Sequence, residues 1–218
     1  MEKQIKGIYV LGIGGSSFQR IELAKACGYE ILGLFHYNND RTGQVDHGYT
    51  IIGSFEDMFA EDIRGKYFLL TMGDMNIRKE LFHRIVSAGG MVPTLIHPTA
   101  EISEFATISS DGVIIDSQVI VQSDCKVEEG AFICSQSMIC HQTTIEPYVF
   151  VAPKSLIGAR LRVKQFAFIG QNATIISTKV KEIGANSTVG AEAVEKKPVL
   201  DGQVVVGNPA KILGNKIL

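Results

Sequence analysis

The chain has 218 residues, a mass of 23.7 kDa and a formal net charge of −2 at pH 7, a length that fits one large domain or two small ones. With 45% hydrophobic and 20% charged residues it can bury a core, which excludes wholesale disorder, and its near-neutral charge gives no basic field for nucleic acid or an anionic membrane. Glycine is in excess at 22 residues, against a usual ~7%. Because no collagen period accompanies it, we expect many tight turns.

The sequence gives no sign of a targeting segment or a disulfide framework. The first residues, MEKQIK, are not followed by an apolar stretch of the signal-peptide kind, and the longest apolar runs, such as Tyr67–Met72, are too short to span a bilayer. The four cysteines, Cys27, Cys125, Cys134 and Cys140, form no CxxC pair and are too few for a disulfide framework. We therefore expect a cytoplasmic protein with reduced thiols.

The first 96 residues alternate strand and helix patterns. Short aliphatic runs that end in glycine predict strands, and apolar residues at helical spacing after Ser or Asp predict helices. The strands are expected at Lys6–Gly12, Tyr29–Phe35, Gly48–Gly53, Tyr67–Gly73 and Met91–Ile96, and the helices at Phe18–Cys27, Ser54–Ile63 and Asp74–Ala88. This alternation predicts a small parallel α/β domain.

After this domain the period of the pattern changes to six. Ile and Val make up about a fifth of the chain, yet they occupy ten successive positions six residues apart. These positions are Val121, Val127, Ile133, Ile139, Ile145, Val151, Ile157, Val163, Ile169 and Ile175. Four residues after each comes a mostly small residue, from Cys125 to Ala173, and the phase continues to Ile102 and Ile108 and to Ile183 and Val189 through one slip on each side. Such a period predicts a β-helix with three faces and 18 residues per coil, with irregular coils near 110–120 and 176–183.

The hexads resemble a known repeat. Ile157–Arg162 and Ile183–Thr188 are similar to the [LIV]-[GAED]-x-x-[STAV]-x repeat of the left-handed β-helix acyltransferases, and Gly207–Lys211 is similar to their closing G-x-P-A-K motif. With the turn Gly12–Gly15, the segment Gly73–Arg78 and the junction Ile96–Pro98, nearly the whole chain resembles the bacterial sugar O/N-acyltransferase family. That family includes enzymes that N-acetylate UDP- or GDP-linked 4-amino sugars.

The resemblance implies an α/β + β architecture. Residues 1–96 would form a Rossmann-like domain that binds a nucleotide sugar, and residues 97–218 a left-handed β-helix acyltransferase domain with a C-terminal tail. The family forms homotrimers, with acetyl-CoA lying between adjacent subunits.

The resemblance also implies a catalytic histidine. The hexad Ile139–Thr144 matches the one that carries it, which makes His141 the expected general base. An amine that attacks a thioester must lose a proton, and a neutral imidazole accepts one at physiological pH. The family places an acid after this histidine; Gln142 stands here and can accept a hydrogen bond through its carbonyl oxygen but cannot stabilise an imidazolium by charge. Because a thioester is already activated, no metal is expected.

Two groups of binding residues follow from the same resemblance. The nucleotide sugar is expected at Gly12, Gly14, Gly15, Ser16, Asn38, Asn39, Gly73, Asn76 and Arg78. Acetyl-CoA is expected at Phe150, Gly158, Ala159, Gly170, Asn208, Pro209 and Lys211, with the turn Gly158–Ala159 as the oxyanion donor and Phe150 replacing a second histidine of the family.

Some of these residues have simpler interpretations. The turn Gly12–Ser17 is an incomplete G-x-G-x-x-G motif, and His36 and Tyr37 stand where a dinucleotide site needs an acid, which disfavours NAD. The glycines can serve backbone geometry alone. Asn76 can cap a helix, and Arg78 and Lys211 can be solvated. Zinc held by Cys134, Cys140 and His141 lacks the usual ligand spacing.

The sequence thus predicts an enzyme that moves an acetyl group from acetyl-CoA to the amine of a nucleotide-linked amino sugar, in bacterial glycan or surface polysaccharide synthesis. Two alternatives stay open. One is a sugar O-acetyltransferase, which the loss of an acid at Gln142 disfavours because a hydroxyl needs a stronger base. The other is a non-catalytic scaffold that binds a sugar nucleotide.

Overall fold

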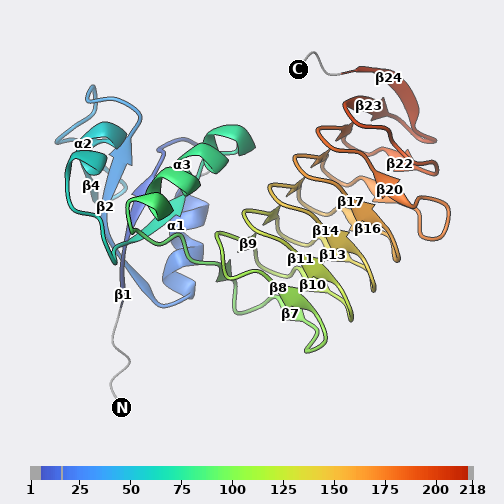
Figure 1. The fold of residues 1–218 in the computed structure, drawn as a ribbon, viewed down its shortest axis with the longest axis horizontal. Helices are drawn as coiled ribbons and strands as arrows, with labels where there is room; N and C mark the ends of the chain where they lie inside the picture. Colours follow the sequence, from blue (N-terminus) through green and yellow to red (C-terminus); the bar gives the residue numbers. More distant parts are fainter. Residues whose placement is uncertain (1–5, 16, 216–218) are drawn as a thin grey trace. The chain divides into compact units, whose positions relative to one another are not determined.

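The computed structural model describes residues 6–15 and 17–215 and divides into two compact units, Met1–Leu95 and Ile96–Leu218. The first is an α/β unit and the second a stack of short parallel strands (Figure 1). Among the described residues, no helix combines the length and apolarity needed to cross a membrane.

The first unit is built on one five-stranded sheet in the order β3-β4-β2-β1-β5. Its strands are β1 (Lys6–Leu11), β2 (Tyr29–His36), β3 (Val45–Asp46), β4 (Tyr49–Ser54) and β5 (Tyr67–Leu70), and its helices are α1 (Ser17–Ala26), α2 (Phe55–Ala60) and α3 (Met75–Ser87). All pairs are parallel except β3–β4, a short hairpin that the sequence pattern did not indicate. Residues of α2 and α3 share a buried core with Leu11, Phe35 and Leu70 of the sheet.

Local signals explain where two of the helices begin. Ser54 and Asp57 form a capping box at α2, and the Asp74 carboxylate accepts the N–H groups of Asn76 and Ile77 at the start of α3. Hydrogen bonds from the backbone N–H and the hydroxyl of Ser54 lower the pKa of Asp57. With one exception, the predicted helices and strands are present within a few residues of their expected ends.

One predicted strand, Met91–Ile96, is wrong as a continuous element. Met91 forms an isolated bridge with Tyr67 and Pro93 lies in another single bridge, whereas a two-residue strand forms at Leu95–Ile96. Pro93 lies between them and has no backbone N–H for a sheet ladder.

The second unit is a β-helix with three faces. The first face holds β7 (Glu101–Ile102), β10 (Ile120–Val121), β13 (Met138–Ile139), β16 (Leu156–Ile157), β19 (Thr174–Ile175) and β22 (Val194–Glu195). The second holds β8 (Thr107–Ile108), β11 (Lys126–Val127), β14 (Thr144–Ile145), β17 (Arg162–Val163) and β20 (Glu182–Ile183). The third holds β6 (Leu95–Ile96), β9 (Ile114–Ile115), β12 (Phe132–Ile133), β15 (Phe150–Val151), β18 (Phe168–Ile169), β21 (Thr188–Val189), β23 (Gln203–Val206) and β24 (Lys211–Asn215).

The six-residue period accounts for this architecture. All ten predicted Ile and Val positions are at most 1% exposed and belong to one core, and the small residues that follow them are also buried. Each strand pairs in parallel with the strand one coil further on, for example Ile139 with Ile157. The predicted fold is confirmed.

The turns at the three edges repeat one backbone conformation. The fourth residue of most hexads has a positive φ, between 55° and 66° from Gln118 to Glu192, where Asn or Gly is the comfortable choice. The two predicted slips lie in such turns. One extra residue separates Ile108 from Ile115, and two separate Ile175 from Ile183, so both irregular coils are longer turns rather than broken strands.

Close stacking of the coils constrains some of these turns to glycine. A Cβ atom on Gly170 would lie 2.5 Å from the backbone nitrogen of Ala191 and 2.6 Å from the carbonyl carbon of Gly190. These are backbone atoms of the next coil, so no rotamer change relieves the contact. Gly214 in β24, by contrast, has open space where its Cβ would be.

We therefore expect Gly170→Ala to destabilise the β-helix. Overpacking costs about 1–3 kcal/mol, which lowers the melting temperature of a protein this size by roughly 3–10 °C. Thermal unfolding followed by circular dichroism at a fixed scan rate measures the change, with Gly214→Ala as the matched control. Equal melting temperatures for the two variants would contradict the assigned coil spacing.

Candidate active site

His141 lies at the first edge of the β-helix, in the turn between β13 and β14. Its backbone is held from both sides: its N–H donates to Oε1 of Gln122 at 3.0 Å, and its carbonyl accepts the N–H of Arg160 at 3.0 Å. The side chain is half-buried. The stacked coils thus fix the position of the imidazole along this edge.

A buried hydroxyl orients the turn above His141. Thr143 is fully buried, and its Oγ1 donates to the carbonyl of Gly158 at 2.8 Å. Because the peptide unit is planar and trans, turning this carbonyl inward points the N–H of Ala159 outward. Cys125 does the same one coil below: its Sγ lies 3.1 Å from the carbonyl oxygen of Cys140. Buried side chains therefore orient the backbone at both predicted parts of the reaction centre, the turn at Gly158–Ala159 and the turn that carries His141.

Gly158 and Ala159 differ in what their N–H groups can do. The Gly158 N–H belongs to the strand ladder and donates to the carbonyl of Ile175 at 3.0 Å. The Ala159 N–H donates to the hydroxyl of Ser177 at 2.8 Å. Only the Ala159 N–H thus lies outside the ladder, which narrows the predicted oxyanion donor to one peptide group.

Gln142 does not orient the imidazole as the sequence led us to expect. It occupies the positive-φ corner of its hexad, with φ +57°, and its side chain is exposed. Its Oε1 accepts a hydrogen bond from Nε of Arg160 at 3.0 Å, one coil further on. We assign Gln142 to the stacking of the coils.

The cysteines near His141 are poor nucleophiles. Burial raises the pKa of both the Cys140 and the Cys125 thiols, which favours the unreactive protonated form. None of the four cysteines, all of which the structure describes, forms a disulfide. In the described part of the chain no group of three His, Cys, Asp or Glu residues is arranged to hold a metal ion.

The other residues predicted for acetyl-CoA lie elsewhere on the β-helix. Gly170 is in the turn between the third and first faces, and Asn208 and Pro209 lie in the turn between β23 and β24 at the end of the third face. Phe150 points outward from the third face, with its ring 5.0 Å from that of Phe132 and 5.2 Å from that of Phe168. Lys211 is exposed in β24. One chain therefore does not bring this whole set to the edge that carries His141.

A second candidate site lies at the carboxyl ends of β1, β2 and β5 in the first unit. A cavity of about 380 Å³ opens there, a volume within the usual range for small-molecule sites. It is lined by Gly12, Ile13, Gly14, Ser17, His36, Tyr37, Phe55, Thr71, Met72, Gly73 and Ile77. This edge of an open parallel sheet, where the chain crosses from one side of β1 to the other, is the ordinary place for a ligand.

A hydroxyl network closes the glycine turn at this cavity. Ser17 Oγ accepts the N–H of Gly14 at 2.7 Å and lies 3.2 Å from Oγ1 of Thr71. Thr71 Oγ1 in turn lies 2.7 Å from the carbonyl of Gly12. Gly12 has φ +93°, a conformation that favours glycine. The turn is thus set by backbone geometry and by two hydroxyls.

His36 and Tyr37 line the cavity, although the sequence interpretation left them out of the site. His36 is 8% exposed, and its Nδ1 lies 2.8 Å from Oδ1 of Asn38. An amide oxygen only accepts, so Nδ1 donates this hydrogen bond. Their position in the sequence could have indicated this role, because residues at or directly after the ends of the parallel strands β1, β2 and β5 converge at one edge of the sheet.

The remaining predicted nucleotide-sugar residues separate into two groups. Gly12, Gly14 and Gly73 line the cavity, whereas Gly15, Asn38, Asn39 and Asn76 do not, and Ser16 lies outside the described residues. Arg78 is only 2% exposed, and its Nη1 donates to the carbonyl of Leu70 at 2.5 Å. Arg78 therefore stabilises the end of β5 from inside the core and does not line the cavity.

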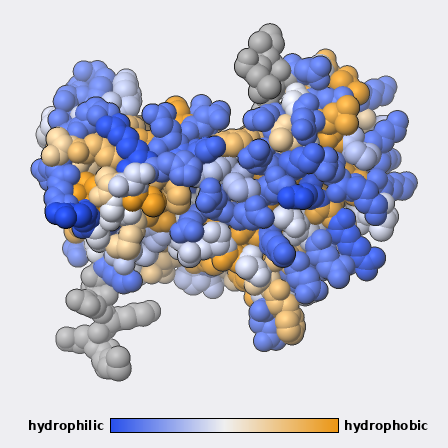
Figure 2. Space-filling model, in the orientation of Figure 1, coloured by the Kyte–Doolittle hydropathy of each residue, from blue (hydrophilic) through white to orange (hydrophobic). Residues whose placement is uncertain are grey.

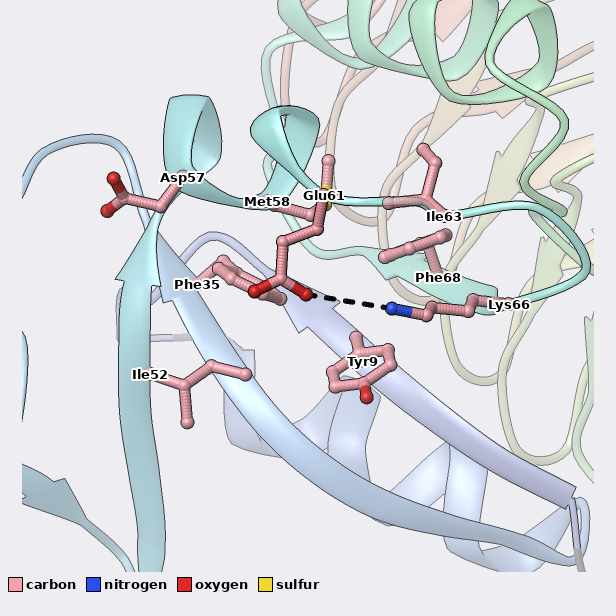
Figure 3. Close-up of a pocket in the computed structure, with 9 residues that line it drawn as sticks. All are labelled: Tyr9, Phe35, Ile52, Asp57, Met58, Glu61, Ile63, Lys66 and Phe68. Atoms are coloured by element: carbon pink, nitrogen blue, oxygen red, sulfur yellow. Dashed lines mark ion pairs between the residues drawn. The ribbon is translucent and has the colours of Figure 1, made fainter.

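The first unit has another cavity, under α2. Figure 3 shows Tyr9, Phe35 and Phe68 along it, with Glu61 facing Lys66. Oε2 of Glu61 and Nζ of Lys66 are 3.8 Å apart. Its volume of about 160 Å³ is well below the range typical of ligand sites, so we do not assign it to the sugar nucleotide.

Both units resemble known proteins. Residues 7–85 match the family model of the PglD N-terminal domain. The whole chain is similar to PerB from Caulobacter crescentus, solved with CoA and GDP-perosamine, with 26% identity, a TM-score of 0.87, and coverage of 96% of this chain and 98% of that one. It is also similar to the acetyltransferase domain of PglB from Neisseria gonorrhoeae, solved with acetyl coenzyme A, with 26% identity, a TM-score of 0.86, and coverage of 96% and 100%.

The resemblance to sugar acyltransferases that the sequence indicated is thus supported over the first unit by the matched domain and over the whole chain by solved sugar acetyltransferases. The Caulobacter perosamine N-acetyltransferase has also been solved as a variant with a histidine replaced by asparagine, and this chain matches it with 25% identity, a TM-score of 0.88, and coverage of 97% and 98%. In these relatives, as here, an α/β unit precedes a left-handed β-helix.

The Thr143 hydroxyl gives a testable link between core and site. Thr143→Val keeps the shape of the side chain but leaves the Gly158 carbonyl without its donor, which costs about 1–3 kcal/mol and frees the Gly158–Ala159 peptide to rotate. We expect a lower melting temperature and a lower kcat.

Thr143→Ser keeps the hydroxyl and is the control for this change. It should stay close to the parent in both thermal unfolding and acetyl-transfer assays. If the valine and serine variants have the same kcat, the buried bond does not orient the turn that carries Ala159.

Proposed function

We propose that this protein is an acetyl-CoA-dependent N-acetyltransferase for a nucleotide-linked 4-amino sugar, with His141 as the general base. The observation that carries the proposal is the first edge of the β-helix. There the half-buried His141 lies one coil below the outward N–H of Ala159, in a chain whose whole length resembles sugar acetyltransferases solved with CoA or acetyl-CoA.

The residues at this edge match the needs of the reaction. The sugar amine attacks the thioester carbon, and the imidazole of His141 accepts the proton that the nitrogen loses. Charge builds on the thioester oxygen in the transition state, and a positioned hydrogen-bond donor at this edge stabilises it. A thioester needs no further activation, so neither a metal nor a covalent intermediate is part of the proposal.

The cavity at the carboxyl ends of β1, β2 and β5 is the proposed nucleotide site. Its glycine turn lets a phosphate approach the backbone closely, and the aromatic ring of Tyr37 and the imidazole of His36 offer flat surfaces for a base. The relative with GDP-perosamine bound supports a sugar nucleotide as the ligand class.

Replacement of His141 tests the activity. We expect His141→Ala to lower kcat by about 10²–10⁴-fold, the usual loss when a general base is removed. Steady-state assays with acetyl-CoA and a panel of UDP-, GDP- and dTDP-linked 4-amino sugars measure this. His83→Ala, which changes an exposed histidine of α3, is the control and should keep full activity.

Two results would contradict the proposal. One is that no sugar nucleotide in the panel is acetylated by the parent protein. The other is that His141→Ala retains full activity.

We further propose that the protein is a cytoplasmic homotrimer. The residues expected to bind acetyl-CoA lie on different edges and faces of one β-helix, so a groove between two copies would bring them to one ligand. Outward apolar side chains are available for such contacts: Phe168 is 40% and Leu156 37% exposed. Figure 2 also shows hydrophobic surface on the C-terminal part of the β-helix, among mostly hydrophilic side chains.

Sedimentation equilibrium tests the assembly. We expect the mass of three chains of 23.7 kDa for the parent and a smaller species with lower kcat for Phe168→Glu, because a buried interface does not tolerate an unpaired charge. Phe105→Glu, at a side chain that is 67% exposed, is the control and should keep the parent mass. A fully active monomeric parent would overturn the trimer.

A further inference from the structure

Ser177 stands at the reaction edge without an assigned role. Hexad positions 18 residues apart stack on neighbouring coils, so Ser123, His141, Ala159 and Ser177 form one column along the first edge. Contacts between neighbouring coils follow this stacking, since the N–H of Arg160 donates to the carbonyl of His141 and the N–H of Ala159 to Oγ of Ser177. With coils about 4.8 Å apart, His141 and Ser177 are roughly 10 Å apart along the edge. Ala159 is the one residue of this column between them.

The Ala159 N–H donates to the following coil because the preceding coil offers no good hydrogen-bond acceptor. One coil lower, the His141 N–H finds the amide oxygen of Gln122 in the coil beneath. The matching position beneath Ala159 is Cys140, whose protonated thiol is a weak acceptor. The Ala159 N–H therefore reaches up to the Ser177 hydroxyl at 2.8 Å.

The Ser177 hydroxyl can still donate a hydrogen bond. Within the described residues its only hydrogen bond is the one it accepts from Ala159, and the side chain is half-buried. Accepting a bond from a fixed backbone N–H polarises the O–H and makes it a better donor. A substrate atom held between His141 and Ser177 along this edge could accept a hydrogen bond from this hydroxyl.

We propose that the Ser177 hydroxyl is the side-chain oxyanion donor of the acetyl transfer, polarised by the Ala159 N–H behind it. The inference rests on the proposed function. As the sugar nitrogen bonds to the thioester carbon, the carbonyl π electrons move to oxygen, which Ser177 stabilises, while the nitrogen proton passes to His141. When the C=O bond re-forms, the C–S bond breaks, and the departing sulfur takes the proton from the imidazolium to give CoA thiol and the N-acetyl sugar.

This arrangement differs from direct donation by the Ala159 N–H, which a thioester oxygen could reach only by displacing Ser177. The two predict opposite outcomes for removal of the hydroxyl. If Ser177 donates, Ser177→Ala lowers kcat; if Ser177 only covers the Ala159 N–H, its removal leaves kcat unchanged or raises it.

Steady-state kinetics of Ser177→Ala and Ser177→Thr separate these outcomes. We expect Ser177→Ala to lower kcat by about 10²-fold, the usual loss of one oxyanion donor, with little change in KM for acetyl-CoA and an unchanged shape of the pH profile, since His141 still acts as base. Ser177→Thr keeps a hydroxyl and should retain most of the activity. Melting temperatures equal to the parent exclude a folding defect, and an unchanged or raised kcat in Ser177→Ala overturns the proposal.

Infrared spectroscopy gives a readout that does not depend on the sugar. With acetyl-CoA labelled with ¹³C at the carbonyl, a hydrogen bond from Ser177 lowers the carbonyl frequency in the parent complex, and Ser177→Ala should return it toward the value in water-free surroundings. Equal frequencies in the parent and Ser177→Ala, or no binding of acetyl-CoA, overturn the proposal. A parent that shows the shift but acetylates no sugar nucleotide instead contradicts the proposed substrate.

Discussion

Everything at the candidate active site depends on the spacing between neighbouring coils of the β-helix. Each two-residue strand hydrogen-bonds only to the strands one coil above and below it, as Ile139 pairs with Ile157 through their parallel ladder, so no single coil is stable alone. The aliphatic side chains that fill the prism hold the coils at this distance, and the backbone groups of the turns must then be satisfied across the same gap. Thr143 and Cys125 do this from inside by holding carbonyls of the coil above. Their inward bonds leave the N–H groups of Ala159 and His141 facing out, where they donate to Ser177 and Gln122, so the packing of the core sets the direction of the hydrogen bonds along the reaction edge.

The two units position their functional groups by different routes. In the α/β unit, side chains meet because parallel strands end at one edge, so residues distant in sequence, such as Gly14, His36 and Thr71, line one cavity. In the β-helix, side chains meet because positions 18 residues apart stack. The first arrangement collects varied chemistry around a ligand, whereas the second repeats one position along an extended edge. An extended co-substrate fits the second and a compact nucleotide head group the first.

The β-helix could be predicted from the sequence because its six-residue repeat continues through many hexads, whereas the hydrogen bonds between coils could not. Ten aliphatic residues at one spacing define the β-helix because each must fill the same interior position, and all ten are buried. Two predicted side-chain roles differ from the contacts in the structure. Gln142 was expected to accept a hydrogen bond beside His141, but at its positive-φ corner the amide oxygen bonds to Arg160. Arg78 was expected near phosphate, but its guanidinium donates to the Leu70 carbonyl inside the core. Ser177 could not be identified because its partner, the Ala159 N–H, is a backbone group of the neighbouring coil, 18 residues earlier in the chain. Hydrogen bonds across coils are set by stacking, which a residue pattern shows only once the fold is known.

The last coil shows how the aliphatic column is ended. Glu195 takes the inward place above Ile175, where every earlier coil of the first face has Ile or Val, and it is 4% exposed. Its Oε1 accepts the N–H groups of Lys196 and Lys197, both at 2.8 Å, so the carboxylate is satisfied by its own turn instead of by water. On the third face, β24 reverses direction and pairs antiparallel with β23. A parallel ladder left open here would offer its N–H and C=O groups to another chain; a carboxylate over one column and a reversed strand along another face make further stacking unfavourable. The repeat is thus closed by residues that break its period, and the reaction edge lies in the regular coils before that break.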